Sequence, residues 1–381
     1  MKKVLIIHNK YQNIGGEDIA VDEEIEILKK NYEVDTLIFK NDLKNILSIG
    51  IGFFFSTNYR SNKLLKDKIE NFLPDIAYVH NTWFKANLGI FKILQKNRIK
   101  TIIKFHNFRY HCTKSHLSNS HIVFGQTCSG CGFKKDKRNF YNKYFEDSYL
   151  KSIFVNIYGR KYLRIIKKPI NHAIVLTKFH QNFMIKNNYK KTNVSIIPNF
   201  INTKLNRKNS DEKYIIYAGR VSREKGVEQL IDAFLDSELN DFAIKIVGDG
   251  PIINKLKKKY IDKRVQFLGE LENKIVLELI SSARAVVTCT KLFEGQPTLL
   301  CEASSMGVPS IFPDSGGIKE FFPNNYDLIF QQYDYQNLTN NLNKLNNRDF
   351  ANAVGDKCKD FYKMNFSEEI YLDKMSSLIN E

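Results

Sequence analysis

A turn in the second half of the chain carries two cations where a phosphorylated ligand can bind. The apolar run that begins at Tyr217 ends at Gly219, whose missing side chain permits a tight turn, and Arg220 and Lys225 follow at the start of a helix. Cations beside a helix N-terminus attract negative charge, because the free N–H groups of the first turn point outward. The pattern therefore favours a diphosphate site.

A second turn, Val247–Pro251, places Gly248 and Gly250 at the end of another apolar run. Glycines at such a position let a ligand approach the main chain closely, although they are also typical of a simple turn. The functional interpretation is that both turns serve one kind of ligand.

Two carboxylates, Glu294 and Glu302, are separated by seven residues around a predicted helix start. Pro297 suits the first helical position, where its missing N–H costs nothing. The free N–H groups of the residues that follow, Thr298 and Leu299 among them, then point at whatever lies above the helix. One carboxylate can contact sugar hydroxyls and the other a ribose. The alternative is that Glu302 is a helix-surface acid and Glu294 a capping acid.

Strands and helices alternate through both halves of the chain, and this alternation predicts where the residues above lie. Helical spacing is present at Ile19–Lys30, Lys178–Asn187, Val227–Leu235 and Asn273–Ser282, after Pro297, and in Phe366–Asn380. Strands are predicted at Val4–His8, Tyr32–Phe39, Asp75–His80, Lys100–Phe105, Ala173–Leu176, Val194–Ile197, Lys213–Ala218, Ala243–Val247, Val265–Leu268, Ala285–Thr288 and Ser310–Phe312. Such nearly continuous apolar strands predict parallel sheets covered by helices on both faces.

The domain organisation follows from the length and from one polar segment. A chain of 381 residues exceeds what one core usually supports, and the polar segment Asn199–Asp211 separates the two alternating halves. We predict an α/β protein with two doubly wound domains, residues 1–200 and 201–365, and a helix in residues 366–381 that packs back toward the first domain. A ligand is expected in the cleft between the two domains.

In order and spacing, these stretches closely resemble glycosyltransferase family 4, the retaining enzymes with two facing Rossmann-like domains, known as the GT-B fold. The resemblance covers nearly the whole chain. It is carried by Gly-Arg-x5-Gly (219–226), Val-Gly-Asp-Gly-Pro (247–251), Phe-Leu-Gly (267–269) and Phe-Glu-Gly-x-Pro-x4-Glu (293–302), with Ile-Pro-Asn (197–199) at the hinge.

The resemblance implies a role for each matching residue. Arg220 and Lys225 would hold the donor's diphosphate and stabilise the charge of the leaving group, as electrostatic catalysis requires. Glu294 would contact the transferred sugar and Glu302 the ribose. His106, at the end of a first-domain strand, would contact the donor sugar; taken alone, it is as well explained as a structural histidine. With His106, Arg220, Lys225 and Glu294 as catalytic residues, the expected donor-binding residues are Gly16, Gly219, Gly248, Gly250, Gly295, Gln296, Thr298, Leu299 and Glu302.

The implied reaction is retaining transfer of a hexose from a UDP- or GDP-sugar to a glycan or a polyprenyl-diphosphate-linked acceptor, in the synthesis of a surface polysaccharide such as capsule or lipopolysaccharide. The sequence contains no Asp-x-Asp, the pattern with which many such enzymes hold a divalent cation. We therefore expect no metal and no cofactor besides the donor. The alternatives are a sugar-nucleotide epimerase of similar fold and a basic, non-catalytic protein that binds nucleic acid or membrane.

Charge is distributed unevenly between the two halves. Residues 1–200 hold 34 Lys and Arg against 15 Asp and Glu, whereas residues 201–381 hold 24 against 26. A basic half implies an anionic partner, either a phosphorylated acceptor, an anionic membrane face or nucleic acid, unless the charge serves only solubility. The basic–aromatic motifs of known nucleic-acid-binding modules are missing, so we expect no nucleic-acid partner.

The segment Leu150–Lys168 combines apolar residues at helical spacing with several basic ones. A helix of this kind can lie on an anionic bilayer, but packing of its apolar face on the domain core is the favoured interpretation. No run of about 18 apolar residues is present, and the apolar start is too short for a signal peptide. We expect a cytoplasmic protein or one bound at the inner face of the plasma membrane.

The six cysteines do not form a disulfide framework in the sequence, because Cys289, Cys301 and Cys358 fall in apparent core segments. The other three, Cys112, Cys128 and Cys131, stand near several histidines in numbers that suit a zinc site. A loop of reduced cysteines without metal is the favoured interpretation.

Overall fold

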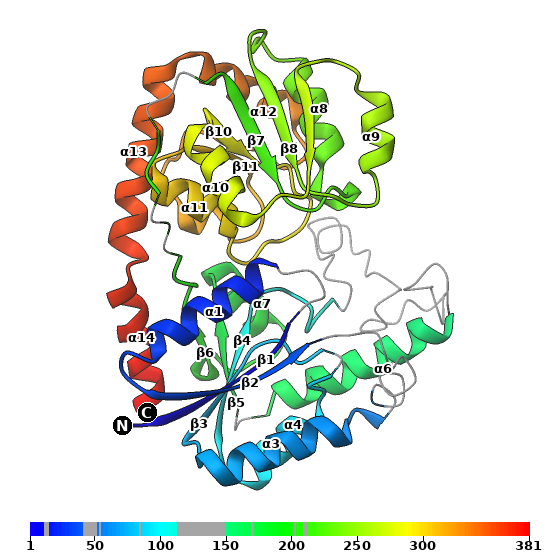
Figure 1. Cartoon of the computed structure of the whole chain (residues 1–381), viewed down its shortest axis with the longest axis vertical. Coiled ribbons are helices and arrows are strands. Elements are labelled where there is room, and N and C mark those ends of the chain that lie inside the picture. The colour runs from blue at the N-terminus through cyan, green and yellow to red at the C-terminus, as the bar shows by residue number, and fades with distance from the viewer. Residues whose placement is uncertain are drawn as a thin grey trace. The chain divides into compact units, whose positions relative to one another are not determined.

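The computed structural model describes residues 1–10, 15–40, 52, 55–83, 85–112, 149–168, 171–201, 203, 205–208 and 212–381. Contacts within the chain divide it into two units. The first unit holds Met1–Phe200 together with Glu368–Glu381, and the second unit holds Ile201–Ser367. Each unit consists of one parallel sheet with helices packed on it (Figure 1).

The six described strands of the first unit are parallel and lie in the order β2-β1-β3-β4-β5-β6. They are β1 (Lys3–Lys10), β2 (Glu33–Lys40), β3 (Ile76–Val79), β4 (Lys100–Phe105), β5 (Asn171–Val175) and β6 (Val194–Ile196). The chain starts at the inner strand β1 and places β2 on one side of it. It then returns to the other side of β1 and adds β3, β4, β5 and β6 in turn. Ligands of doubly wound sheets bind at such a switch point, beyond the carboxyl ends of the central strands.

The C-terminal helix contributes to the core of the first unit. Met375 and Leu378 of this helix are buried with Val21 of α1 and with Val4 and Tyr78 of the sheet. Lys2 and Lys100 also donate hydrogen bonds to its last carbonyl groups.

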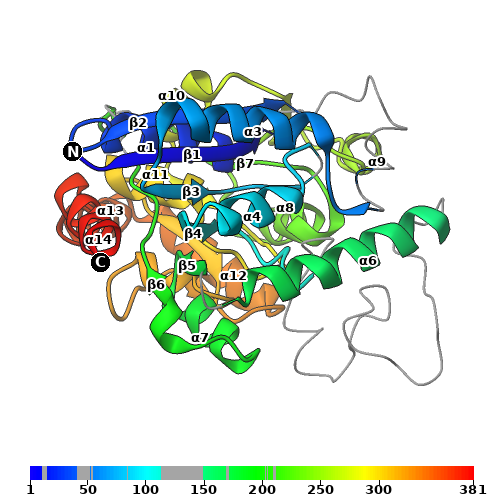
Figure 2. The same ribbon diagram turned by 90° about the horizontal axis from the view of Figure 1, so that it is seen from below.

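In Figure 2, α3 and α4 lie side by side on the same unit. The described helices of the unit are α1 (Gly16–Leu28), α3 (Tyr59–Phe72), α4 (Gly89–Lys96), α6 (Tyr149–Ile166), α7 (Lys178–Lys186), the short η3 (Lys191–Asn193) and α14 (Glu368–Asn380).

The second sheet is also parallel, in the order β12-β11-β10-β7-β8-β9, so its switch point lies between β7 and β10. The strands are β7 (Tyr214–Ala218), β8 (Ala243–Val247), β9 (Val265–Gly269), β10 (Ala285–Val287), β11 (Ser310–Pro313) and β12 (Ile329–Phe330). The described helices are η4 (Arg223–Lys225), α8 (Val227–Leu235), α9 (Ile253–Lys259), α10 (Asn273–Ser282), α11 (Thr298–Met306), η5 (Ile318–Phe321), α12 (Tyr335–Asn343), η6 (Lys344–Asn346) and α13 (Arg348–Asn365).

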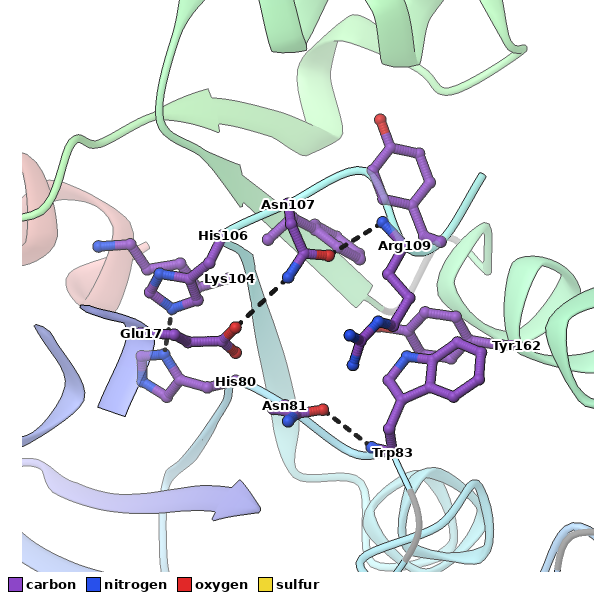
Figure 3. A pocket seen from close by; sticks show the side chains of 11 residues that line it. Glu17, His80, Asn81, Trp83, Lys104, His106, Asn107, Arg109 and Tyr162 are labelled. Atoms are coloured by element: carbon purple, nitrogen blue, oxygen red, sulfur yellow. Dashed lines mark hydrogen bonds between the residues drawn. The ribbon is translucent and has the colours of Figure 1, made fainter. Parts of the chain in front are cut away.

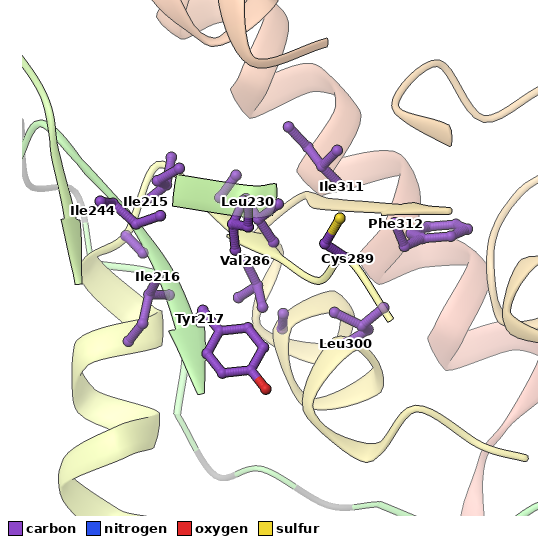
Figure 4. Close-up of a cluster of buried hydrophobic side chains, with 14 of the residues drawn as sticks. Ile215, Ile216, Tyr217, Leu230, Ile244, Val286, Cys289, Leu300, Ile311 and Phe312 are labelled. Atoms are coloured by element: carbon purple, nitrogen blue, oxygen red, sulfur yellow. The ribbon is translucent and has the colours of Figure 1, made fainter. Parts of the chain in front are cut away.

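Branched aliphatic residues of the central strands form the middle of the second core. Ile215 and Ile216 of β7 and Val286 of β10 are fully buried, and Leu230 of α8 and Leu300 of α11 close over them (Figure 4). The two strands that flank the switch point are therefore held rigidly, and the loops after them start from fixed positions.

The predicted strands and the alternation are confirmed, and the main differences concern helices. The sequence analysis predicts no helix for the segments that form α3, α4, α9, α12 and α13, and no strand for the short β12. The C-terminal helix starts at Glu368, because Phe366 leaves helical geometry at the end of α13 with φ −133° and ψ 33°. Pro297 precedes α11 as its N-cap, with ψ 84°, instead of occupying the first helical position.

The basic helix α6 packs on the first unit through its aromatic residues. Tyr158 and Tyr162 are buried, with their ring centres 5.0 and 6.0 Å from the ring of Trp83. Arg160 and Arg164 of the same helix are exposed. The favoured interpretation, packing on the core, thus holds for the residues of α6 whose side chains are described. Throughout the described part of the chain, no helix is both long and apolar enough to cross a bilayer.

Candidate active site

Two loops beyond the second sheet touch each other backbone to backbone. The φ of Gly248 is +116°, and a Cβ at that position would lie 2.1 Å from the carbonyl oxygen of Gly219. A Cβ at Gly250 would lie 2.2 Å from the carbonyl oxygen of Val221, whose own N–H donates to Asp249 across 2.9 Å. No side chain fits between these loops. The glycines predicted to bind the donor thus first of all let the loops after β7 and β8 meet.

The loop after β10 is joined to the segment after β7 by a pair of opposite charges. The Lys225 ammonium donates to Glu294 Oε1 across 2.5 Å, and the Thr290 hydroxyl donates to the same oxygen across 3.0 Å. The close approach depends on Gly226, where a Cβ would lie 2.0 Å from the Cys289 carbonyl oxygen. Two residues predicted from separate motifs are therefore in direct contact at the switch point of the second sheet.

Helix α11 carries the remaining candidates of the second unit. Gly295 and Gln296 are buried in the loop before it, and the Gln296 amide lies 3.8 Å from the Cys301 sulfur. Thr298 and Leu299 are the first residues of the helix and are half-buried. Glu302 is 7% exposed, so the alternative of a helix-surface acid is wrong for this residue.

Arg220 is exposed directly after Gly219. The Tyr217 hydroxyl donates to the Arg220 carbonyl oxygen across 2.8 Å, which ties this turn to the end of β7. An exposed guanidinium on a fixed turn is suited to receive an anion from solution, because it presents several donors in one plane.

In the first unit, the start of α1 is held in place by Asp18. Its carboxylate accepts the Gly15 N–H across 2.9 Å and lies 2.8 Å from the Nε2 atom of His8, a buried residue of β1. Gly16 is the first residue of the helix. The glycine turn is thus fixed to the central strand of the sheet by a side chain that the motif analysis did not single out.

A pocket opens at the carboxyl ends of β3 and β4, and His106 lines it (Figure 3). His80 follows β3 as His106 follows β4, and the two imidazoles are joined by a hydrogen bond of 3.0 Å between His80 Nδ1 and His106 Nε2. Burial lowers the pKa of His106 well below its usual range, and the positive charges near it act in the same direction. The pocket is lined by Glu17, His80, Asn81, Trp83, Lys104, Phe105, His106, Asn107, Arg109, Tyr110 and Tyr162.

Behind this pocket lies a buried ion pair that the sequence analysis missed. The side chains of Lys104 and Glu24 are both completely buried and in contact with each other. The Tyr78 hydroxyl donates to the second carboxylate oxygen of Glu24 across 2.7 Å. Two signals in the sequence point to this region. Lys104 lies within an otherwise apolar strand, and His80 directly follows a second apolar strand.

The predicted cysteine cluster lies mostly outside the described residues. Cys112 is described and buried, whereas Cys128 and Cys131 fall within the gap between residues 112 and 149. Cys289, Cys301 and Cys358 are buried free thiols, as expected for core residues. Within the described ranges, no three side chains of His, Cys, Asp or Glu gather as ligands for a metal ion.

Residues 200–363 are similar in sequence to a known protein family. They match the family described as Glycosyl transferases group 1. The chain is 24% identical over 251 residues, 65% of this chain and 70% of the relative, to the uncharacterized glycosyltransferase MJ1178 of Methanocaldococcus jannaschii. It is 23% identical over 385 residues, 93% of this chain and 91% of the relative, to the Escherichia coli UDP-Gal:alpha-D-GlcNAc-diphosphoundecaprenol alpha-1,3-galactosyltransferase.

Among solved structures, Anabaena Alr3699/HepE in complex with UDP and glucose matches with a TM-score of 0.72 at 14% identity, over all of both chains. At this identity the likeness establishes the fold. Together with the two doubly wound sheets, it confirms the predicted GT-B architecture. The segment that holds Arg220, the Lys225–Glu294 pair and Glu302 lies wholly within residues 200–363, the part of this chain that matches the glycosyl transferases group 1 family.

Proposed function

We propose that the protein is a retaining glycosyltransferase that moves a hexose from a UDP- or GDP-sugar to a glycan or a lipid-diphosphate-linked acceptor during synthesis of a surface polysaccharide. The observation that carries the proposal is the contact between Lys225 and Glu294 at the switch point of the second sheet. A cation and a carboxylate side by side suit a ligand that is anionic at one end and rich in hydroxyl groups at the other.

The chemistry of transfer assigns a separate task to each residue. An ammonium group has three donors, and Glu294 accepts from one, so Lys225 retains donors for a phosphate oxygen. With Arg220 it would stabilise the negative charge that develops on the leaving diphosphate. Glu294 would accept hydrogen bonds from the transferred sugar, and Glu302 from the ribose. In the first unit, His106 would contact the donor sugar and Gly16 the diphosphate, and the site would need no divalent metal.

The donor and acceptor classes are inferred from relatives. HepE was solved with UDP and glucose, and the E. coli relative uses UDP-Gal and a diphosphoundecaprenol-linked acceptor by its name. The net positive charge of residues 1–200 is consistent with an acceptor that carries a diphosphate. An acceptor of that kind would bring the protein to the inner face of the plasma membrane, where the exposed Arg164 of α6 would attract anionic lipids.

Calorimetric titration of UDP and of GDP, with a chelator present, tests the proposal. We expect one nucleotide to bind the full chain, and Arg220→Ala and Glu302→Ala to weaken that binding about tenfold or more. Lys213→Ala is the matched control. Lys213 is an exposed, ion-paired lysine of the same unit that directly precedes β7, so it lies at the amino end of this strand, whereas the site lies beyond its carboxyl end.

Two outcomes would count against the proposal. If neither nucleotide binds, the donor site is wrong. If binding requires added Mg²⁺ or Mn²⁺, the metal-free part of the proposal fails while the donor site stands. Incubation of the protein with the bound donor and a lipid-diphosphate glycan then separates transfer from epimerisation, because only transfer releases nucleoside diphosphate.

A further inference from the structure

Two histidines that are far apart in the sequence share one hydrogen bond beside the first unit's pocket. His80 Nδ1 and His106 Nε2 are 3.0 Å apart (Figure 3). Between two neutral imidazoles this bond contains a single proton, carried either by His80 Nδ1 or by His106 Nε2. The two arrangements leave His106 with opposite properties at its other ring nitrogen: a donor in the first and an acceptor in the second.

Glu24 decides between the arrangements. Its Oε2 atom lies 3.9 Å from His80 Nε2, with both side chains completely buried. Glu24 is also in contact with the buried Lys104 ammonium and accepts a hydrogen bond from the Tyr78 hydroxyl, so its two oxygens face donors. A carboxylate attracts an N–H group and repels a lone pair, so the His80 proton is favoured on Nε2, and Nδ1 of His80 is then an acceptor.

The surroundings keep both imidazoles neutral. Around His80 stand the His8 ring, 5.9 Å away and bound to Asp18, the Tyr78 ring at 4.4 Å, and the Lys104 ammonium held by Glu24. Burial lowers the pKa of His80 well below its usual range, with His8 and Lys104 adding to the effect. A second cation in this place would therefore be costly, and a single neutral pair is the stable state.

We infer that His80, oriented by Glu24, holds His106 as the neutral tautomer protonated on Nε2, so that His106 Nδ1 is a fixed hydrogen-bond acceptor for a hydroxyl group of the bound sugar. Nδ1 is buried and has no hydrogen-bond partner among the described residues, whereas His106 itself lines the pocket. The tautomer follows from the contacts alone, and its use toward a sugar hydroxyl rests on the proposed function. His80 and Glu24 are thus positioning residues, which act through His106.

Long-range proton–nitrogen NMR of the full chain with labelled histidine tests the tautomer directly, because protonated and unprotonated ring nitrogens differ widely in chemical shift. His106 is assigned from the signal lost in His106→Gln. Between about pH 6 and 8 we expect protonated Nε2 and unprotonated Nδ1 in both His106 and His80. A His106 protonated on Nδ1 would overturn the inference, whether or not the protein transfers a sugar.

Two substitutions of His80 separate orientation from packing. His80→Phe keeps an aromatic ring but removes the acceptor, and we expect mixed tautomers of His106. We expect kcat to fall roughly tenfold to a hundredfold, as when the partner of a metal-ligating histidine is removed, at nearly unchanged donor KM. His80→Asn returns an oxygen near the place of Nδ1 and should restore most of kcat. If His80→Phe is folded and leaves both the tautomer and kcat unchanged, the inference is wrong. If the wild-type chain transfers no sugar, the proposed function fails, and the NMR result still decides the tautomer.

Discussion

The Lys225 ammonium lies 2.5 Å from a carboxylate oxygen of Glu294, although 69 residues separate them in the chain. Their backbones belong to the segments after β7 and β10. These two strands are neighbours in the second sheet, and the chain adds its later strands on opposite sides of them. Neither residue is fully buried: the side chains are 29% and 25% exposed. The pair is therefore both fixed by the sheet and accessible to a ligand.

The two members of this pair should respond differently to substitution. Lys225→Ala removes a cation from the proposed diphosphate site, and we expect the Kd for the nucleoside diphosphate to rise about tenfold to a hundredfold in calorimetry. Glu294→Gln should leave that Kd within about threefold and lower kcat for sugar transfer, because its carboxylate is assigned to the sugar. Equal effects of both substitutions on nucleotide binding would contradict this division of tasks.

Gly248→Ala should destabilise the second unit. The added Cβ would meet the Gly219 carbonyl oxygen at 2.1 Å, and this oxygen belongs to the backbone and cannot move aside as a flexible side chain could. We expect a loss of about 3 kcal/mol in the free energy of unfolding by urea, followed by circular dichroism. Gly269→Ala is the control: its φ is also positive, at +73°, but nothing lies within 4 Å of the added atom, so the loss should be about 1 kcal/mol. A similar loss in both variants would show that backbone strain, not the clash, dominates.

The stability of the first unit should fall on acidification. Burial lowers the pKa of His180 to about 3 and that of His80 well below 6.5. In the unfolded chain these imidazoles take up protons near pH 6.5, whereas in the folded unit they do not. The stabilising contribution of each histidine is therefore fully present above about pH 6.5 and is lost below it, by up to about 1.4 kcal/mol per pH unit.

Fluorescence of Trp83, the single tryptophan and a residue of the first unit, follows this unfolding in urea titrations at different pH. His180→Gln is the control, because glutamine can keep a hydrogen bond to the Tyr110 hydroxyl but does not titrate. We expect a shallower pH dependence in this variant. An unchanged slope would mean that His180 is not the source of the effect.

Replacing one member of the buried Lys104–Glu24 pair should reduce the free energy of unfolding more than replacing both members. Lys104→Met leaves the Glu24 carboxylate buried without its counter-ion, and we expect a loss of about 3–5 kcal/mol in the free energy of unfolding, reported by Trp83 fluorescence. In the double variant Lys104→Met/Glu24→Gln no charge remains, and the amide that replaces the carboxylate can still accept from the Tyr78 hydroxyl. The double variant should be more stable than Lys104→Met alone. Additive losses would argue that the two side chains do not interact.

The amino-acid sequence was sufficient to predict the alternating strands and helices, the two doubly wound sheets and the turns that hold Arg220, Lys225 and Glu294. These features depend on residues close together in the chain: apolar runs, helical periodicity and the glycines at strand ends. Helices such as α3 and α12 escaped prediction because their apolar residues are sparse, and packing on the sheet stabilises them more than their own periodicity indicates.

Which distant side chains meet was decided by the tertiary structure. Nothing in the sequence pairs Glu24 with Lys104, yet parallel pairing of β1, β3 and β4 and the docking of α1 bury them together. The same pairing brings His80 beside His106, since neighbouring parallel strands end at the same edge of the sheet. Strand order is a property of the whole chain and is not encoded in local spacing, and so these contacts could be identified only from the folded structure.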